Sequence, residues 1–328
     1  IQSKVDTMKT VIITGGNSGL GYYCAQEIAR HEDWYVIIAC RNPDKANQAL
    51  KKLREHTSSD RLETMLLDLA SLASIRQFAQ EFARRDLPPL RAIACNAGVQ
   101  FIQRQTYTED GFDPTVGVNH LGHFLLVNLL LKQLVDPARI ILVGSDTHDS
   151  SKTTGMPAPY FREPSLIAHP EQDSQLKNQK IGEIGRIAYT TSKLCNVLCA
   201  YELSRRLQLA RQNEEESLPI TVNVFNPGLM PGSGLAQDYT PVAKFVWNNI
   251  LPILCKFVPN VNTMENAGTA LARLVLDPEL ENVTGKYFSG FKMIDSSQES
   301  YDQDKARQLW EGSIELTQLK SEETLFEI

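Results

Sequence analysis

Short, nearly continuous apolar runs alternate along the chain with longer segments in which apolar residues recur every three or four positions. The short runs are typical of strands buried on both faces, and the longer segments of amphipathic helices. Strands are predicted at Thr10–Thr14, Tyr35–Ala39, Leu62–Leu67, Arg91–Cys95, Arg139–Val143, Ile220–Phe225 and Lys286–Phe288. Helices are predicted near residues 20–30, 44–55, 72–84, 115–134, 187–209 and 263–276. The alternation predicts an α/β fold, a doubly wound parallel sheet of about seven strands with helices on both faces.

The segment 146–186 interrupts this alternation. It is long, polar and rich in Pro, Gly, Ser and His, and it shows no clear hydrophobic period. A stretch of this length inside a compact domain is either functional or disordered. Because it follows one suspected catalytic strand and precedes the suspected catalytic helix, we interpret it as a substrate-site insertion, with an inert loop as the alternative.

No repeat or low-complexity linker divides the chain, so we predict a single domain over residues 8–320. Met8 is the expected natural start, and Ile1–Lys9 lacks the apolar core of a secretion signal. The most lipophilic later stretch, Pro241–Val258, is interrupted by lysine, asparagine and proline, which argues against a transmembrane helix.

Composition narrows the function classes. The formal net charge of -6, without any basic block, argues against a general nucleic-acid binder. The six cysteines form no CxxC pair, which favours reduced, buried thiols in a cytosolic-type compartment. Four histidines could suggest a metal site: His120, His123, His148 and His169. No carboxylate or cysteine pattern accompanies them to complete a set of metal ligands, so no metal site is predicted. We expect a soluble protein of the cytoplasm or an organelle stroma, with membrane association as the alternative.

A glycine-rich turn follows the first predicted strand and opens a helix, between Thr14 and Gly21. Glycines permit the tight turn and the close approach of a pyrophosphate, and the helix N-terminus offers free N–H groups and a favourable dipole. A glycine cluster alone indicates only a turn, but this position between strand and helix predicts dinucleotide binding. The residues assigned to the cofactor here are Gly15, Asn17, Ser18, Gly19, Leu20 and Gly21.

The end of the second predicted strand decides between NAD and NADP. An acidic side chain there would bind a ribose 2′-hydroxyl and repel a 2′-phosphate. The sequence has instead Ala39-Cys40-Arg41-Asn42, and Arg41 can donate two hydrogen bonds to a phosphate; the alternative is a solvated surface arginine. NADP(H) is therefore the predicted cofactor. We expect Asp68-Leu69 beside the adenine and Asn96-Ala97-Gly98 beside the ribose.

Four residues form the predicted catalytic set. Tyr189 and Lys193 lie four positions apart, on one face of a helix, and the lysine cation lowers the pKa of the phenol from roughly 10 towards neutral pH. Lys193 is also expected to hydrogen-bond the nicotinamide ribose. Ser145 follows the strand Arg139–Val143 and is expected to hold a substrate carbonyl oxygen while Tyr189 protonates it. Asn119 is expected to anchor a water in a proton relay that ends at Lys193. By itself, the Tyr–Lys spacing is also common in solvated helices.

These motifs together resemble the short-chain dehydrogenase/reductase superfamily, whose glycine turn, Asn-Ala-Gly motif, Asn–Ser–Tyr–Lys set and Pro-Gly motif occur here in order. The chain is most similar to retinol dehydrogenases and light-dependent protochlorophyllide oxidoreductases, through residues 39–42, 119–124, 192–198 and 285–288. The resemblance implies that Pro227, Gly228 and Ser233 also belong to the cofactor site, together with Tyr189 and Lys193. It implies a substrate lid over residues 229–258, for which membrane-surface contact and core packing are the alternatives.

The two related groups imply different substrates. The insertion, with its segment 155–159, resembles the protochlorophyllide enzymes, whereas Ser145 resembles the alcohol and carbonyl enzymes. The pigment reductases also carry a cysteine directly after the Pro-Gly motif. This chain has Leu229 there, which cannot donate a proton.

The leading hypothesis is an NADP(H)-dependent oxidoreductase that transfers a hydride to or from a bulky, mostly apolar carbonyl or alcohol. The alternative is light-dependent reduction of a ring C=C bond in a tetrapyrrole such as protochlorophyllide, and a third hypothesis is a non-catalytic NADP(H)-binding protein. The predicted partner is a hydrophobic small molecule. The exact substrate, the physiological direction and the choice between monomer and homodimer stay open.

Overall fold

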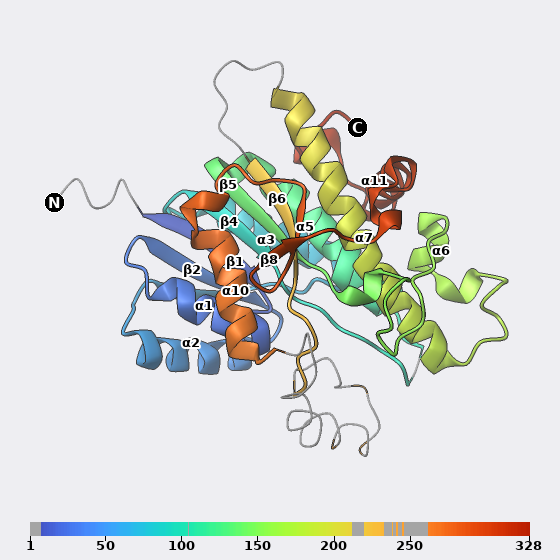
Figure 1. The fold of residues 1–328 in the computed structure, drawn as a ribbon. Helices are drawn as coiled ribbons and strands as arrows, with labels where there is room; N and C mark the ends of the chain where they lie inside the picture. Colours follow the sequence, from blue (N-terminus) through green and yellow to red (C-terminus); the bar gives the residue numbers. More distant parts are fainter. Residues whose placement is uncertain are drawn as a thin grey trace.

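The computed structural model describes residues 8–103, 105–211, 220–232, 238, 241, 245 and 262–328. They form one sheet with helices on both of its faces (Figure 1). Ser233 and most of the predicted lid, 229–258, lie outside the described residues.

The sheet has eight strands in the order β3-β2-β1-β4-β5-β6-β7-β8. The first seven strands in the chain are parallel, and β8 pairs antiparallel with β7. The bounds are β1 Lys9–Thr14, β2 Trp34–Cys40, β3 Leu62–Leu66, β4 Leu90–Cys95, β5 Leu134–Val143, β6 Ile220–Asn226, β7 Lys286–Ser289 and β8 Lys292–Ile294. The doubly wound sheet and its seven predicted strands are confirmed. The eighth is an addition, because its three residues are exposed and carry no apolar alternation.

The helices lie in two layers (Figure 1). One layer has α1 (Gly19–Ala29), α2 (Pro43–Thr57) and α10 (Met264–Leu276), and the other has α3 (Leu72–Arg84), α5 (Gly122–Leu130), α7 (Ile181–Arg211) and α11 (Gln303–Thr317). Successive residues of a strand point to opposite faces. In β1, Val11 and Ile13 therefore pack with the first layer, and Ile12 packs with the second.

The predicted helix at 115–134 is interrupted at Asn119. It is divided into α4 (Pro114–Val116), a π-helical turn η1 (Gly117–Leu121), α5, and a 3₁₀ turn η2 (Leu131–Gln133). Gly122 follows the π turn, and a Cβ there would lie 2.5 Å from the Leu69 carbonyl oxygen. Since π-helical turns are frequent at functional sites, the position of Asn119 inside one favours a functional role for this residue.

This interrupted helix is also the most membrane-like part of the described chain. Pro114–Gln133 is the one helical stretch there that is long and apolar enough to cross a membrane. Of its most apolar window, 89% is buried inside the fold, as expected for a core helix.

Helix α7 begins at Ile181, so the last residues of the predicted insertion 146–186 are helical rather than irregular. Gly182 and Gly185 hide this start in the sequence, because glycine is a poor helix former. A side chain at Gly185 would overlap the Phe101 carbonyl oxygen, so close packing requires glycine there. The rest of the insertion contains the 3₁₀ turns η3 (Asp146–His148) and η4 (Pro170–Gln172) and the short helix α6 (Pro164–Ala168).

The C-terminal region closes the α7 side of the molecule. Turn η9 (Gln298–Tyr301) contacts α7, and α11, which is followed by turn η10 (Ser321–Glu323), packs on α6 and α7. Turn η8 (Pro278–Leu280) follows α10, and Leu280 packs with the core of the other layer. Trp310 of α11 is buried, with its ring 4.9 Å from that of Phe124 on α5. The C-terminal helix therefore contributes to the hydrophobic core on this side of the sheet.

Candidate active site

The glycine turn and the Asn-Ala-Gly motif are joined through Thr14, the last residue of β1. The Thr14 hydroxyl oxygen accepts the backbone N–H groups of Asn96 at 2.9 Å and Ala97 at 3.0 Å. The Asn96 amide in turn donates to the Thr14 carbonyl at 2.8 Å. These bonds hold two predicted cofactor motifs side by side at the carboxyl ends of β1 and β4, where ligands of doubly wound sheets bind.

The conformation of the glycine turn fits a dinucleotide. Gly15 and Gly19 have positive φ angles of 66° and 55°, which favour glycine. A Cβ on Gly21 would lie 2.5 Å from the Asn96 amide nitrogen. The N-cap residue of α1, Ser18, makes no side-chain cap, and no acidic residue lies in the first turn. The first N–H groups of α1 are therefore available to an anion.

The residues predicted around the adenosine lie at the ends of β2 and β3. Arg41 is exposed directly after β2, where Asn42 caps α2 by accepting the N–H of Lys45 at 2.9 Å. The Asp68 carboxylate accepts the N–H of Ala70 at 3.0 Å, and Leu69 is buried. The exposed Arg41 guanidinium after β2 is therefore a suitable partner for a phosphate group.

Asn119 holds the chain after β4 to helix α7. Its Oδ1 accepts the N–H of Val99 at 2.8 Å, and its Nδ2 donates to the Val99 carbonyl at 3.0 Å and to the Ser192 hydroxyl at 3.1 Å. These bonds use both amide protons of the Asn119 side chain. The Asn119 backbone carbonyl accepts a hydrogen bond from Nδ1 of His123 at 3.1 Å.

Tyr189 and Lys193 are both buried on α7, beside the end of β5. The Lys193 ammonium lies 5.6 Å from the centre of the Tyr189 ring and donates to the Val143 carbonyl at 3.1 Å. Burial lowers the pKa of Lys193 to about 8. The residue is therefore still mainly a cation at pH 7 and favours the ionised form of a nearby phenol.

The neighbourhood of Lys193 includes two further predicted residues. A Cβ placed on Gly98 would lie 3.6 Å from both the Asn119 Oδ1 and the Lys193 Nζ. The structure therefore brings the Asn-Ala-Gly motif, the π turn and helix α7 close together beside Lys193.

Ser145 follows β5 and Gly144. Its hydroxyl oxygen accepts the N–H of Thr147 at 3.2 Å and the Thr147 hydroxyl at 3.0 Å, which caps η3. Turn η3 packs against α7, so Ser145 lies on the side of the sheet that carries Tyr189. Gly228 adopts a φ of 75° after β6, and Pro227 precedes it, so the Pro-Gly motif forms a turn at the same sheet edge.

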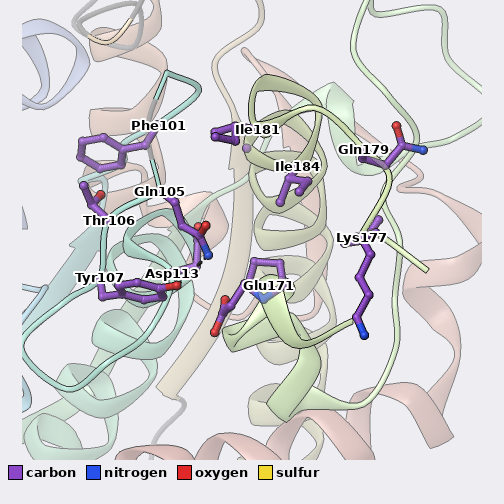
Figure 2. Close-up of a pocket in the computed structure, with 13 residues that line it drawn as sticks. Phe101, Gln105, Thr106, Tyr107, Asp113, Glu171, Lys177, Gln179, Ile181 and Ile184 are labelled. Carbon is purple, nitrogen blue, oxygen red and sulfur yellow. Dashed lines mark hydrogen bonds between the residues drawn. The ribbon is translucent and has the colours of Figure 1, made fainter. Parts of the chain in front are cut away.

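A cavity of about 280 Å³ lies between the insertion and the chain after β4 (Figure 2). Its lining consists of Phe101, Gln105, Thr106, Tyr107, Asp113, Pro170, Glu171, Leu176, Lys177, Gln179, Ile181, Ile184 and Gly185. Gly185 precedes Tyr189 by one helical turn. In Figure 2 the Glu171 side chain lies on the Tyr107 side of the cavity, whereas the Lys177 side chain lies on the opposite side. Burial raises the pKa of Asp113 to about 6.

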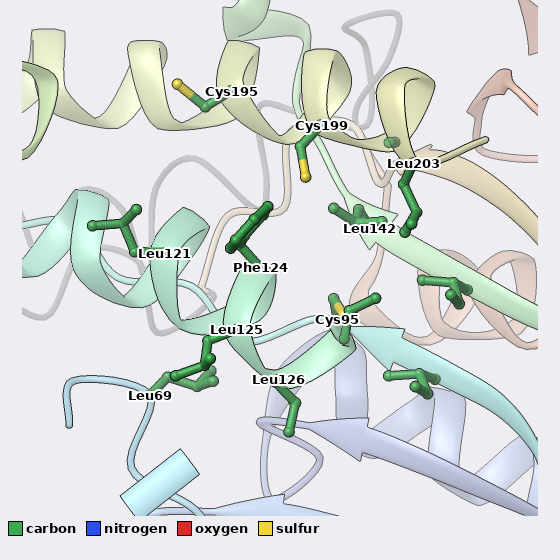
Figure 3. Packing of buried hydrophobic residues seen from close by; sticks show 14 of the residues in the cluster. Leu69, Cys95, Leu121, Phe124, Leu125, Leu126, Leu142, Cys195, Cys199 and Leu203 are labelled. Atoms are coloured by element: carbon green, nitrogen blue, oxygen red, sulfur yellow. The ribbon is translucent and has the colours of Figure 1, made fainter. Parts of the chain in front are cut away.

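Three of the four candidate histidines and the described cysteines lie in the interior of the fold. His120, His123 and His148 are buried, and burial lowers the pKa of each. Among the described residues no group of three metal-binding side chains occurs. The described cysteines are all free and buried, and Cys95, Cys195 and Cys199 lie among leucines of the core (Figure 3). Cys255 lies outside the described residues.

The sequence analysis did not predict the linking roles of two residues. Thr14 joins two cofactor motifs, and His148 joins Ser145 to the C-terminal region through the backbone N–H of Ser297. Thr14 carries a local signal, since a polar residue ends an apolar strand beside the glycine turn. The partner of His148 lies 149 residues away and leaves no such signal.

The profile of the short chain dehydrogenase family matches residues 9–157, and that of the AcuH dehydrogenase domain matches residues 235–326. Protochlorophyllide reductase A, chloroplastic, of Arabidopsis thaliana is 34% identical over 97% of this chain and 80% of the relative. The WW domain-containing oxidoreductase of Homo sapiens is 32% identical over 97% of this chain and 70% of the relative. A solved structure of an actinorhodin polyketide ketoreductase with NADPH has a TM-score of 0.60 at 18% identity, covering 87% of this chain and 98% of that one.

The chain belongs to the short-chain dehydrogenase/reductase family of oxidoreductases. Identity above 30% over nearly its whole length carries this assignment and confirms the predicted resemblance to protochlorophyllide reductases. The solved ketoreductase, at 18% identity, supports the fold.

Proposed function

We propose that the chain is an NADP(H)-dependent oxidoreductase that transfers a hydride to or from a bulky, mostly apolar carbonyl or alcohol. The observation that carries the proposal is the buried Tyr189–Lys193 pair, placed beside the end of β5 that leads to Ser145. Burying a lysine cation next to a phenol costs free energy, and buried groups with shifted pKa values concentrate at catalytic sites. The decisive experiment is oxidation of NADPH by the pure protein with a panel of aldehydes, ketones and protochlorophyllide.

NADP(H) fits the residues at the sheet edge. The free N–H groups of α1 would hold the pyrophosphate, and exposed Arg41 would pair with the 2′-phosphate. The chain after β4, through Asn96, Ala97 and Gly98, would lie along the ribose. When bound, the cofactor would supply or accept the hydride. The solved ketoreductase similar to this chain carries NADPH, which supports the same choice here.

The side chains of the site would handle the proton. In the reducing direction Tyr189 would donate its phenolic proton to the substrate oxygen, while the Ser145 hydroxyl donates a hydrogen bond to that oxygen. The Lys193 cation would stabilise the resulting phenolate. The Asn119 carbonyl would hold the water that returns a proton through Lys193. Because the pKa of Lys193 is about 8, this support is present below pH 8 and is lost as the pH rises through that value.

The cavity supports a bulky substrate. It contains the aromatic and aliphatic groups of Phe101, Leu176 and Ile184 beside the turn that precedes Tyr189. The insertion contributes Leu176, so we propose that residues 146–186 form part of the substrate site. An apolar tail in this cavity would extend away from the reacting carbon.

Light-dependent reduction of a tetrapyrrole is the second candidate function. The 34% identity to protochlorophyllide reductase A favours it. Leu229 after the Pro-Gly motif argues against it, because a leucine has no proton to give. Spectra of the protein with pigment and NADPH, before and after illumination, test it directly. If the pigment band is lost only after illumination, this second candidate replaces the first.

The setting of the enzyme is part of the proposal. We propose a cytoplasmic or stromal location, noting that the Arabidopsis relative is chloroplastic. Monomer and homodimer are both consistent with the family, and peripheral membrane contact through residues 229–258 is a further option. Sedimentation and vesicle co-pelleting of the full chain measure these properties. A non-catalytic, NADP(H)-binding protein would bind cofactor and leave the whole substrate panel unchanged.

Replacement of Arg41 by aspartate tests the cofactor choice. It should weaken NADPH binding by about 2 kcal/mol, roughly thirtyfold, because a charge-assisted pair is lost and a like charge faces the phosphate. Titration of NADPH and NADH into both proteins measures this. Lys51→Asp on the exposed face of α2 makes the same change in net charge and should leave both affinities unchanged. Equal NADPH affinity in the Arg41 variant and the parent would remove Arg41 from the site.

Substrate length tests the cavity. Each buried CH₂ gains roughly 0.8 kcal/mol, so kcat/KM should rise about fourfold per carbon along an aldehyde series until the cavity is filled. Ile184→Trp, which narrows the cavity, should move this limit to a shorter aldehyde. Leu209→Trp, at an exposed position 61% accessible on the same helix, is the matched control. A flat series in the parent protein would point to a small polar carbonyl instead.

A further inference from the structure

His148 connects Ser145 to a distant part of the chain. The ring is completely buried. Its Nδ1 lies 2.7 Å from the Ser145 carbonyl oxygen, and its Nε2 lies 2.9 Å from the backbone nitrogen of Ser297. A backbone N–H can only donate, so Nε2 must accept. The neutral ring therefore carries its proton on Nδ1 and donates it to Ser145.

The surroundings keep this ring neutral. Burial is the main cause that lowers its pKa, and the face of the ring packs against Tyr287, with 4.9 Å between ring centres. The charged groups near it are Asp146, Asp149 and Lys152. A second ring proton, on Nε2, would point at the backbone N–H of Ser297. Two hydrogen-bond donors would then face each other, which is unfavourable. The hydrogen-bond pattern thus admits one tautomer.

Ser145 needs such support because the sheet ends just before it. The N–H of Gly144 donates to the Phe225 carbonyl at 2.8 Å, which is the last bond between β5 and β6. Beyond that point, the Ser145 carbonyl accepts only from residue 148 among the hydrogen bonds of the described chain, through its N–H at 3.1 Å and its ring. The orientation of the peptide that follows Ser145 is therefore set by His148.

We propose that His148 is a positioning residue that aligns the Ser145 hydroxyl for its contact with the substrate oxygen. The inference rests on the proposed function, since it assigns the residue that orients one of its catalytic groups. His148 acts through the Ser145 backbone and does not touch substrate. Ser297 fixes the ring from the other side, so the C-terminal region contributes to the precision of the active site.

Three variants separate positioning from packing. His148→Asn brings an amide N–H to the place of Nδ1, His148→Gln brings an amide oxygen to the place of Nε2, and His148→Leu removes both. A misplacement of about 1 Å costs up to a hundredfold in rate, so we expect kcat to fall about tenfold in the Leu and Gln variants. The Asn variant should retain kcat within about threefold, and all three should bind NADPH as the parent does.

Tyr201→Phe is the matched control. The Tyr201 hydroxyl lies 2.7 Å from the Ser296 hydroxyl, so it ties the neighbouring residue of the same segment to α7 without passing through Ser145. This variant should lower the melting temperature and leave kcat unchanged. Rescue by Asn but not Gln, at similar melting temperatures, supports positioning. Equal kcat in all variants, or losses that follow melting temperature alone, overturn it; if the Leu variant does not fold, the Asn and Gln variants decide.

A direct measurement of Ser145 keeps this inference separate from the proposed function. In protein labelled at the Ser145 carbonyl, the ¹³C shift should match the parent in the Asn variant and move in the Gln variant. A parent protein that turns over no substrate contradicts the proposed function. The ¹³C shift then still decides the positioning, and an unchanged value in the Gln variant overturns it.

Discussion

Tyr189→Phe is expected to lower the turnover of carbonyl substrates by at least about a hundredfold, the usual scale for loss of a general acid. The variant keeps the ring that packs beside Lys193 and loses only the hydroxyl. Folding and NADPH binding should therefore stay close to those of the parent. Single-turnover oxidation of NADPH with the best aldehyde measures the effect.

The control for this variant is a second buried tyrosine on α7. Tyr201→Phe removes a hydroxyl that binds Ser296, away from the site, and should leave turnover unchanged. Normal turnover by the Tyr189 variant would mean that another group supplies the proton, and the proposed chemistry would be wrong.

Lys193→Met should abolish most of the turnover and at the same time stabilise the protein at pH 7 by about 3 kcal/mol. Burial lowers the pKa of Lys193 from 10.5 to about 8, so the folded state holds a proton less tightly than the unfolded chain does. Methionine has a similar length and no charge to desolvate. Loss of activity together with a gain in stability is the result expected when a residue is kept for function at a cost in stability.

The sign of the pH dependence follows from the two pKa values. Between about 8 and 10.5 the unfolded chain binds more protons at this position, so the parent gains stability as the pH rises through that window. Below pH 8 Lys193 is protonated in both the folded and the unfolded states, so the full free-energy cost of burying its charge is present. The stability advantage of the Met variant should therefore shrink between pH 8 and 10. Chemical unfolding of both proteins at pH 7 and pH 9.5 measures it, and equal stabilities at pH 7 would contradict the argument.

The strands could be predicted because a parallel sheet buries both faces of each strand. Runs such as Val11–Ile13 are therefore apolar without interruption, and the pattern is local. The glycine turn, Arg41 and the Tyr189–Lys193 spacing are also local signals. Their chemistry follows from residue type and from the distance along one strand or helix.

The helix boundaries were less predictable where packing overrides propensity. Helix α7 contains Gly185 in its first turns, because the chain after β4 passes too close there for a side chain. The π turn at Asn119 replaces what looks like a regular apolar helix. Helix α11 was not predicted, and the structure shows that its buried face packs on α6 and α7.

By itself the sequence determined the sheet, the family and the kind of chemistry, because those depend on periodicity and on residues near one another in the chain. Only the tertiary structure decided how the Asn119 amide is used, that Lys193 is buried enough to shift its pKa, and that a cavity adjoins the turn before Tyr189. It alone brought Ser297 to His148. Hydrogen bonding and desolvation depend on groups within a few ångströms in space. The spacing of residues along the chain does not show which distant backbone group will lie that close.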